Sequence, residues 1–225
     1  MKKLIQGIVD FRKALTEENR DLFAKLALGQ KPDSLFIACS DSRVVPNLFA
    51  STNPGDLFVL RNIGNLVPPA ESSHQDHSAS AVIEFAVFSL NVSDIIICGH
   101  SECGAMETLI QGVKDPSCCH LKSWLKHGEA SLNRVKEGFI IDPSLPEHNQ
   151  VSQVNVLQQM EHVKTYSFVR ERLEKGDLRI HGWWFDIAKA QVHCYEKDLN
   201  QFVVIDEEES HLILERLESH VPLSV

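Results

Sequence analysis

Residues 94–104 read DIIICGHSECG, an apolar run that passes directly into a polar loop. The first part, Asp94–Cys98, has the length and the branched side chains of a strand that is buried on both faces. A helix is expected to begin near Glu102, shortly after the strand ends. The segment therefore predicts a strand, a short polar loop and a helix in close succession.

Two other apolar runs have the same form. The run SLFIA at residues 34–38 leads into Cys39, and the run DLFVL at residues 56–60 leads into Arg61. The carboxyl ends of neighbouring parallel strands lie at one edge of a sheet, where open α/β sheets bind their ligands. We therefore expect Cys39, Arg61 and His100 to lie together at this edge.

The rest of the chain alternates between helical and strand patterns. Helices are expected at residues 77–90, 121–135 and 151–173, later strands at residues 178–185 and 201–205, and a proline-containing loop at residues 138–148. Such alternation predicts an α/β fold with a mainly parallel central sheet flanked by helices.

The N-terminal segment also has apolar residues at helical spacing, and Gly29 ends this pattern. We expect one or two helices in residues 1–28, forming an arm of a single domain that spans residues 1–225. The pattern leaves two roles open for this arm, which either covers the core or contacts a second copy of the chain.

The composition excludes several classes of protein. The chain has 225 residues, of which 22 are Lys or Arg and 31 are Asp or Glu, so its formal net charge is −9. An acidic chain without a basic run is unsuited to nucleic acid or to an anionic membrane. No stretch approaches the roughly 18 apolar residues of a membrane-spanning helix. The apolar run at residues 4–9 is too short for a signal peptide, and we expect no targeting segment.

Six cysteines are too few for a disulfide scaffold in a chain of this length. Several lie in apolar, strand-like surroundings, which favours reduced thiols and a cytoplasmic location. Cys98 lies inside an apolar run and is expected in the core. We assign no function to Cys118, Cys119 or Cys194.

Three residues are candidate metal ligands, namely Cys39, His100 and Cys103. They offer two sulfurs and one imidazole nitrogen. A four-coordinate Zn²⁺ ion binds this mixture of ligands. Three protein ligands with an open fourth position are typical of a catalytic zinc site. A single buried cysteine is more often a small apolar residue, but the two spacings C-x-D-x-R and H-x-x-C at neighbouring strand ends favour a metal site.

Asp41 follows Cys39 by two residues, and its carboxylate has two alternative roles. As a fourth zinc ligand, Asp41 would close the site. Paired instead with Arg43, whose planar guanidinium binds a carboxylate at two points, it would leave the metal open and accept a hydrogen bond from the nucleophile.

The sequence resembles the β-class carbonic anhydrases in three segments: CSDSR at residues 39–43, RNIGNLVPP at residues 61–69 and GHSECG at residues 99–104. The resemblance extends over most of the chain and implies reversible hydration of carbon dioxide to bicarbonate by zinc-bound hydroxide. It implies zinc binding through Cys39, His100 and Cys103, and an Asp41–Arg43 pair in the active form, with Asp41 on the zinc only in a closed state. It further implies a parallel sheet with one antiparallel edge strand, in a homodimer or a dimer of dimers.

The resemblance also implies an apolar pocket for carbon dioxide. Its wall residues are Phe58, Ile63 and Phe85, and hydrogen bonds to substrate are expected from Gln30 and from the backbone N–H of Gly104. Phe85 stands where plant-type members have a tyrosine, so a hydroxyl contact is lost. In a dimer, Gln30, Phe58 and Phe85 are candidates to face the zinc of the partner chain.

Some members of this family bind bicarbonate at a second, non-catalytic pocket and close at lower pH. The tryptophan and the tyrosine of that pocket are replaced here by Phe36 and Phe185, and only the arginine remains, as Arg61. Because phenylalanine has no polar hydrogen to donate, we expect this chain to lack the bicarbonate switch.

Two other functions remain alternatives to carbon dioxide hydration. The same zinc fold would also suit a related heterocumulene such as carbon disulfide, a difference that would lie in the access channel. The other is a non-catalytic oligomer stabilised by zinc, which the presence of Asp41 and Arg43 disfavours.

Overall fold

The computed structural model describes residues 1–75 and 77–218. The chain forms two compact units, Met1–Lys31 and Pro32–Val225. Within the described residues, no helix has the length and apolar character needed to cross a membrane.

The N-terminal unit consists of two helices, α1 (Lys2–Ala14) and α2 (Glu17–Leu26). Thr16 caps α2 by accepting a hydrogen bond from the backbone N–H of Asn19 at 3.2 Å. The rings of Phe11 and Phe23 meet edge to face with centroids 6.2 Å apart. Neither helix contains a buried residue, so the apolar side of α1 is exposed within this unit.

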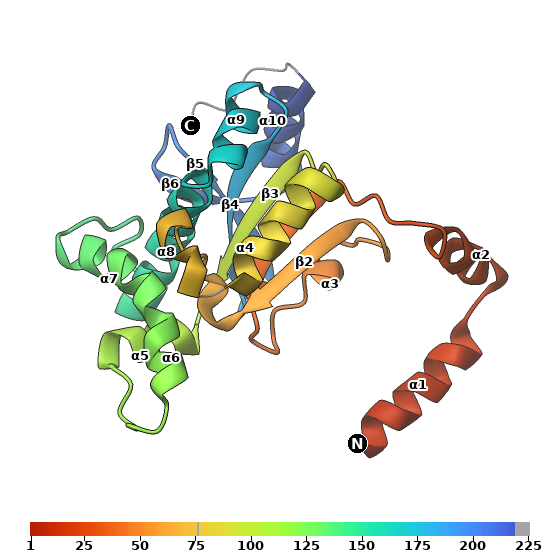
Figure 1. Cartoon of the computed structure of the whole chain (residues 1–225), viewed down its shortest axis with the longest axis horizontal. Coiled ribbons are helices and arrows are strands. Elements are labelled where there is room, and N and C mark those ends of the chain that lie inside the picture. The colour runs from red at the N-terminus through yellow and green to blue at the C-terminus, as the bar shows by residue number, and fades with distance from the viewer. Residues whose placement is uncertain (76, 219–225) are drawn as a thin grey trace. The chain divides into compact units, whose positions relative to one another are not determined.

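The second unit is built on a six-stranded sheet of order β2-β1-β3-β4-β5-β6 (Figure 1). Its strands are β1 (Ser34–Cys39), β2 (Leu57–Asn62), β3 (Asp94–His100), β4 (Arg179–Asp186), β5 (Gln191–Glu196) and β6 (Gln201–Val204). The first four run parallel, and β5 pairs antiparallel with both β4 and β6. The predicted mainly parallel sheet with an antiparallel edge is confirmed. The strand of opposite direction is β5, and β6 lies outside it.

Helices and short helical turns connect these strands. They are α3 (Pro46–Phe49), η1 (Ile63–Asn65), η2 (Ala70–Gln75), α4 (His77–Glu84), η3 (Phe85–Ser89), α5 (Gly104–Gln111), α6 (Cys119–Leu125), η4 (Lys126–Gly128), α7 (Glu129–Lys136), α8 (Glu147–Lys164), α9 (Ser167–Glu174) and α10 (Glu207–Glu218).

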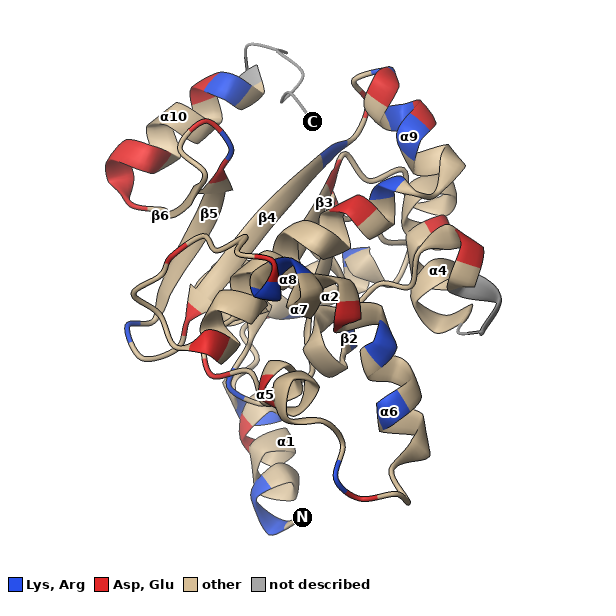
Figure 2. Ribbon diagram, turned by 90° about the vertical axis from the view of Figure 1, so that its left-hand side faces the viewer, with Lys and Arg blue, Asp and Glu red and all other residues tan. Residues whose placement is uncertain are grey.

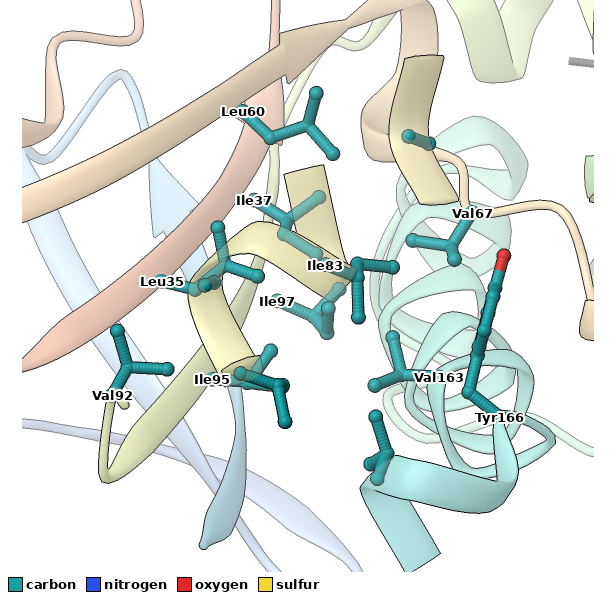
Figure 3. Close-up of a cluster of buried hydrophobic side chains, with 14 of the residues drawn as sticks. Leu35, Ile37, Leu60, Val67, Ile83, Val92, Ile95, Ile97, Val163 and Tyr166 are labelled. Carbon is teal, nitrogen blue, oxygen red and sulfur yellow. The ribbon is translucent and has the colours of Figure 1, made fainter. Parts of the chain in front are cut away.

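Both faces of β1 and β3 are buried, which explains the unbroken apolar runs of these two strands. Alternate residues of β1 and β3 pack on one face against α4, α8 and α9; this cluster includes Leu35, Ile37, Ile83, Ile95, Ile97 and Val163 (Figure 3). The other face carries Phe36, Ala38, Ile96 and Cys98, as expected for a period of two along a strand. The expectation that Cys98 is a core residue is therefore confirmed.

The structure departs from the expected elements in several places, and helices α3 and α10 were not among the expected elements. Residues 121–135 form not one helix but α6, η4 and α7, and residues 151–173 divide into α8 and α9. Thr165 stands at this division, where its hydroxyl donates to the carbonyl of His162 and accepts from the backbone N–H of Ala70. Strand β5 was not expected, because its polar residues give no apolar run.

Helix α10 follows β6 and has three glutamates in its first turn, Glu207–Glu209, with Arg216 in its last turn (Figure 2). Negative charge in the first turn and positive charge in the last turn stabilise a helix, because they interact favourably with its dipole. Arg216 also forms ion pairs with Glu196 of β5 and with Glu209, and so attaches α10 to the antiparallel part of the sheet.

Candidate metal centre

The three predicted ligands lie together at the carboxyl edge of the parallel sheet. Cys39 ends β1, His100 ends the neighbouring β3, and Cys103 precedes the first residue of α5. One donor atom of each residue lies within 4.8 Å of the other two, and all three side chains are buried. Two strand ends and one helix start thus bring together residues that are as many as 64 positions apart.

The His100 ring leaves one nitrogen available for a metal. Its Nδ1 lies 2.8 Å from the carbonyl oxygen of Ser101, whereas its Nε2 is buried without a hydrogen-bond partner among the described residues. A carbonyl only accepts hydrogen bonds, so Nδ1 carries the proton and Nε2 presents a lone pair. Such a bond at the second ring nitrogen is typical of metal-binding histidines.

The two thiols interact with each other. The hydrogen bond with Cys103 lowers the pKa of Cys39, and the backbone N–H of Gly64 contributes by donating to Cys39 Sγ at 3.3 Å. The same pairing with Cys39 raises the pKa of Cys103, since two thiolates at this distance repel one another. A divalent cation would relieve this repulsion. Two sulfurs, one nitrogen and an open fourth position therefore fit Zn²⁺.

Asp41 lies close to this centre and is held by Arg43. The guanidinium Nε and Nη2 donate to the two carboxylate oxygens at 2.9 and 2.8 Å, and the backbone N–H of Arg43 donates to Oδ1 at 3.0 Å. These hydrogen bonds hold the pKa of Asp41 well below its usual range. Arg43 Nη2 also donates to the carbonyl of Glu102 at 2.9 Å, which joins the Asp41 loop to the loop of Cys103.

Arg61 fixes the backbone on the other side of Cys39. Its Nε and Nη2 donate to the carbonyl of Cys39 at 3.0 and 2.9 Å, and Nη2 also donates to the carbonyl of Asp41 at 2.6 Å. The guanidinium of Arg61 is thus engaged with the ligand loop.

The expected substrate residues fall into separate places. Phe58 of β2 and Phe85 of η3 have ring centroids 5.7 Å apart. Ile63 directly precedes Gly64, whose backbone N–H contacts Cys39. Gly104, the first residue of α5, directly follows the ligand Cys103. Gln30 belongs to the N-terminal unit and is exposed there.

The strand register places Phe58 away from the metal ligands of its own chain. Phe58 pairs with Leu35, whereas Asn62 pairs with Cys39. Four residues along a strand correspond to about 13 Å. Phe58 and the two cysteine ligands also belong to different apolar clusters.

The region corresponding to the second bicarbonate pocket is filled by aromatic rings. Phe49 stacks on Phe185 with centroids 4.8 Å apart, and Phe36 contacts both Phe49 and Trp183. Phe36 and Phe185 are buried in this cluster.

Helix α8 carries a group of polar residues that the sequence analysis missed. The buried polar side chains of this helix include Asn149, Ser152, Asn155 and Gln159. Their spacing of three, three and four residues places them on one face of a helix. That periodicity was visible in the sequence, but a polar helix face usually indicates solvent.

Two of these residues hold the loop that follows β3. Asn149 accepts from the backbone N–H of Glu102 at 2.7 Å, and Ser152 Oγ donates to the carbonyl of His100 at 2.8 Å. The close approach of α8 requires Gly99, since a Cβ there would lie 2.7 Å from Val156 Cγ2.

The other two hold the loop that follows β2. Asn155 Nδ2 donates to the carbonyl of Gly64 at 3.0 Å, and Gln159 Oε1 accepts from the backbone N–H of Val67 at 2.8 Å. One helix therefore fixes two of the loops that surround the candidate metal centre.

A second group of donor atoms consists of Cys194, Glu196 and Glu209, again within 4.8 Å of one another. Arg216 is paired with both carboxylates. The guanidinium offsets part of the negative charge of this cluster, which connects β5 to α10.

Comparison with known proteins agrees with this geometry. The carbonic anhydrase family model matches residues 34–192. A carbonic anhydrase of Synechocystis sp. is 38% identical over 211 residues, covering 90% of this chain and 74% of that protein. Beta carbonic anhydrase 1 of Caenorhabditis elegans is 32% identical, covering 99% of this chain and 95% of that protein.

Solved structures of β-carbonic anhydrases are also similar to this chain. The β-carbonic anhydrase CcaA has a TM-score of 0.83 at 38% identity, covering 91% of this chain and 98% of that chain. One of two tetrameric β-carbonic anhydrases of Sordaria macrospora has a TM-score of 0.73 at 31% identity, covering 86% of this chain and 95% of that one. The chain therefore belongs to the β-carbonic anhydrases and is an enzyme of carbon dioxide hydration.

Proposed function

We propose that this chain hydrates carbon dioxide reversibly to bicarbonate and a proton with one zinc ion held by Cys39, His100 and Cys103. The observation that carries the proposal is the convergence of their three buried donor atoms within 4.8 Å. The unpartnered Nε2 of His100 supports it further, because a buried nitrogen without a partner is costly unless a ligand satisfies it. When bound, zinc would supply a water of lowered pKa, and so a hydroxide able to attack carbon dioxide near neutral pH.

Asp41 orients the nucleophile in this proposal. Its carboxylate stays ionised, because Arg43 holds its pKa well below the usual range. An ionised carboxylate only accepts hydrogen bonds, and the lone pairs that Arg43 leaves free can accept one from the nucleophile. Arg43 thereby keeps Asp41 as a hydrogen-bond acceptor rather than a fourth metal ligand.

The neutral substrate fits an apolar pocket that two copies of the chain form together. Phe58 lies too far along β2 to face the zinc site of its own chain, as the register indicates, and the Phe85 ring lies beside it. Phe85 is 45% exposed, so its ring is available to a second copy. In this assembly Gln30 and the backbone N–H of Gly104 donate to the substrate oxygens, and Ile63 completes the apolar wall.

We propose that the assembly is a homodimer or a dimer of dimers. The Sordaria macrospora relatives are described as tetrameric. The N-terminal helices offer a contact surface, because Leu4, Ile8 and Phe11 are exposed within their unit. All six cysteines are free thiols, which supports a cytoplasmic location.

The test is stopped-flow hydration of carbon dioxide on protein of measured metal content. We expect about one zinc per chain, loss of activity with a chelator and recovery on adding zinc. Hydrolysis of carbon disulfide under the same conditions separates the two substrates. Zinc-loaded protein that turns over neither compound would indicate the non-catalytic oligomer and contradict the proposal.

A further inference from the structure

The peptide unit between Ile63 and Gly64 lies directly against the Cys39 thiol. Its N–H, on Gly64, donates to Cys39 Sγ at 3.3 Å. Its carbonyl oxygen, on Ile63, accepts from Trp124 Nε1 at 2.7 Å. A single amide therefore contacts a candidate metal ligand through one end and is held by an indole at the other.

The carbonyl of Gly64, which belongs to the next peptide unit, is fixed by Asn155 Nδ2 at 3.0 Å. The orientation of the Asn155 amide is itself determined, because its Oδ1 accepts from Ser131 Oγ at 3.0 Å and from Gln159 Nε2 at 2.9 Å. Asn155, Ser131 and Gln159 are all buried. Gly64 is thus held on both sides by side chains from α6 and α8.

The backbone at Gly64 is suited to this role. Its φ of +77° lies in the left-handed region that favours glycine. A Cβ at this position would lie 3.0 Å from Met106 Cε and 3.1 Å from Ala105 Cβ. The absence of a side chain permits both the turn and the approach of the amide to Cys39.

We propose that Trp124 and Asn155 are positioning residues for Cys39, an inference that rests on the proposed function. A hydrogen bond to a thiolate withdraws electron density from the sulfur and so reduces its donation to a bound metal. A hydrogen bond accepted at the amide carbonyl strengthens the N–H of the same amide as a donor. Trp124 would therefore tune the Cys39 ligand without touching the metal or the substrate.

The test uses the full chain loaded with Co²⁺ in place of zinc. Trp124→Phe keeps an aromatic ring and removes the N–H. We expect the thiolate-to-cobalt charge-transfer absorption to move to longer wavelength than in the wild type. We also expect zinc affinity, measured by competition with a chromophoric chelator, to fall about 10-fold, because the loss of a fixed orientation at Cys39 outweighs the stronger donation from its sulfur.

Trp183→Phe is the matched control. It removes the same indole N–H from the aromatic cluster on the other face of the sheet, and both readouts should stay at wild-type values. If Trp124→Phe and Trp183→Phe show the same absorption band and the same zinc affinity, the proposal is wrong.

Asn155→Ala is a second variant and should move the absorption band in the same direction in folded protein, because Gly64 loses its fixed orientation toward Cys39. Trp124→Phe decides the proposal if Asn155→Ala does not fold, because Trp124 is only half-buried. A wild-type cobalt protein without any thiolate band would show that the proposed ligands are wrong. A wild-type band that Trp124→Phe leaves unmoved would contradict only the role of Trp124.

Discussion

Two aspartate–arginine pairs lie at opposite edges of the parallel sheet. Asp41 and Arg43 follow β1 at the carboxyl edge, whereas Asp94 begins β3 and pairs with Arg179, the first residue of β4. In both pairs, Nε and Nη2 of the arginine bind the two carboxylate oxygens, at 2.7–2.9 Å. Asp94 precedes His100 by six residues, which corresponds to about 20 Å along the strand.

The partners of the two aspartates differ in their distance along the chain. Asp94 is also bound by His181 Nε2 at 2.7 Å and by Ser93 Oγ at 2.6 Å, so two residues of β4 and the residue before β3 saturate its oxygens. Arg43 is two residues from Asp41, and their pairing closes only a short turn. The same chemical pair therefore connects strands at one edge and prepares a hydrogen-bond acceptor at the other.

The largest expected effect concerns the ligands at the carboxyl edge. Cys39→Ala should lose both zinc and carbon dioxide hydration, because two ligands do not make a catalytic zinc site. Cys98→Ala, in the core of the neighbouring strand, is the matched control and should keep both. Metal analysis with stopped-flow assays measures this, and full zinc content in Cys39→Ala would refute the ligand assignment.

The second effect concerns the carboxylate at the same edge. Asp41→Asn should keep the fold and the zinc, but kcat/KM should fall on the order of 10²-fold or more, because the nucleophile loses an oriented acceptor. Arg43→Ala should also reduce the rate, since it releases Asp41. Near wild-type rates in both variants would exclude this role for the pair.

The opposite edge should show the reverse pattern. Asp94→Asn should lower the free energy of unfolding by about 2–3 kcal/mol, because Arg179 loses a charged partner. The activity of the folded fraction should stay near that of the wild type. Denaturant unfolding and stopped-flow assays on the same sample separate the two quantities. If Asp94→Asn loses a larger fraction of its activity than of its folded protein, the Asp94–Arg179 pair is not purely structural and the two edges do not differ in this way.

Acid should narrow the stability difference between wild type and Asp94→Asn. Burial raises the pKa of Asp94, but hydrogen bonds from His181, Arg179 and Ser93 outweigh it, so the pKa lies well below its usual range. A carboxyl with a lowered pKa stabilises the fold above its unfolded pKa of about 4 and loses that contribution as pH falls through its folded value. Denaturant unfolding from about pH 6 to about pH 2 tests this, and a constant difference would contradict it.

The smallest expected effect is the response to bicarbonate. Phe36, Phe49 and Phe185 pack where the second pocket would lie, and Arg61 is engaged with the ligand loop. Hydration rates should therefore depend on bicarbonate without sigmoidal behaviour, and Asp41 should stay on Arg43. Sigmoidal inhibition would show that the pair at the carboxyl edge opens by another route.

The sequence indicated the carboxyl edge better than the rest of the molecule. Cys39 and His100 directly follow apolar runs, so the strand pattern alone predicts that they meet. The Asp94–Arg179 pair was not predictable in this way, because it joins residues 85 positions apart that carry no motif. Trp124 was missed for a similar reason, since its partner is a backbone carbonyl 61 residues away.

The polar face of α8 has a consequence for how the site opens. The amide N–H groups of Glu102 and Val67 are both bound by side chains of this one helix. Neither loop can expose its amide without breaking a bond to α8, so displacement of the helix releases both loops at once. We therefore expect the two loops to behave as one cooperative unit in local unfolding. Hydrogen exchange at these two distant amides should show similar protection, and unequal protection would show that the loops open separately.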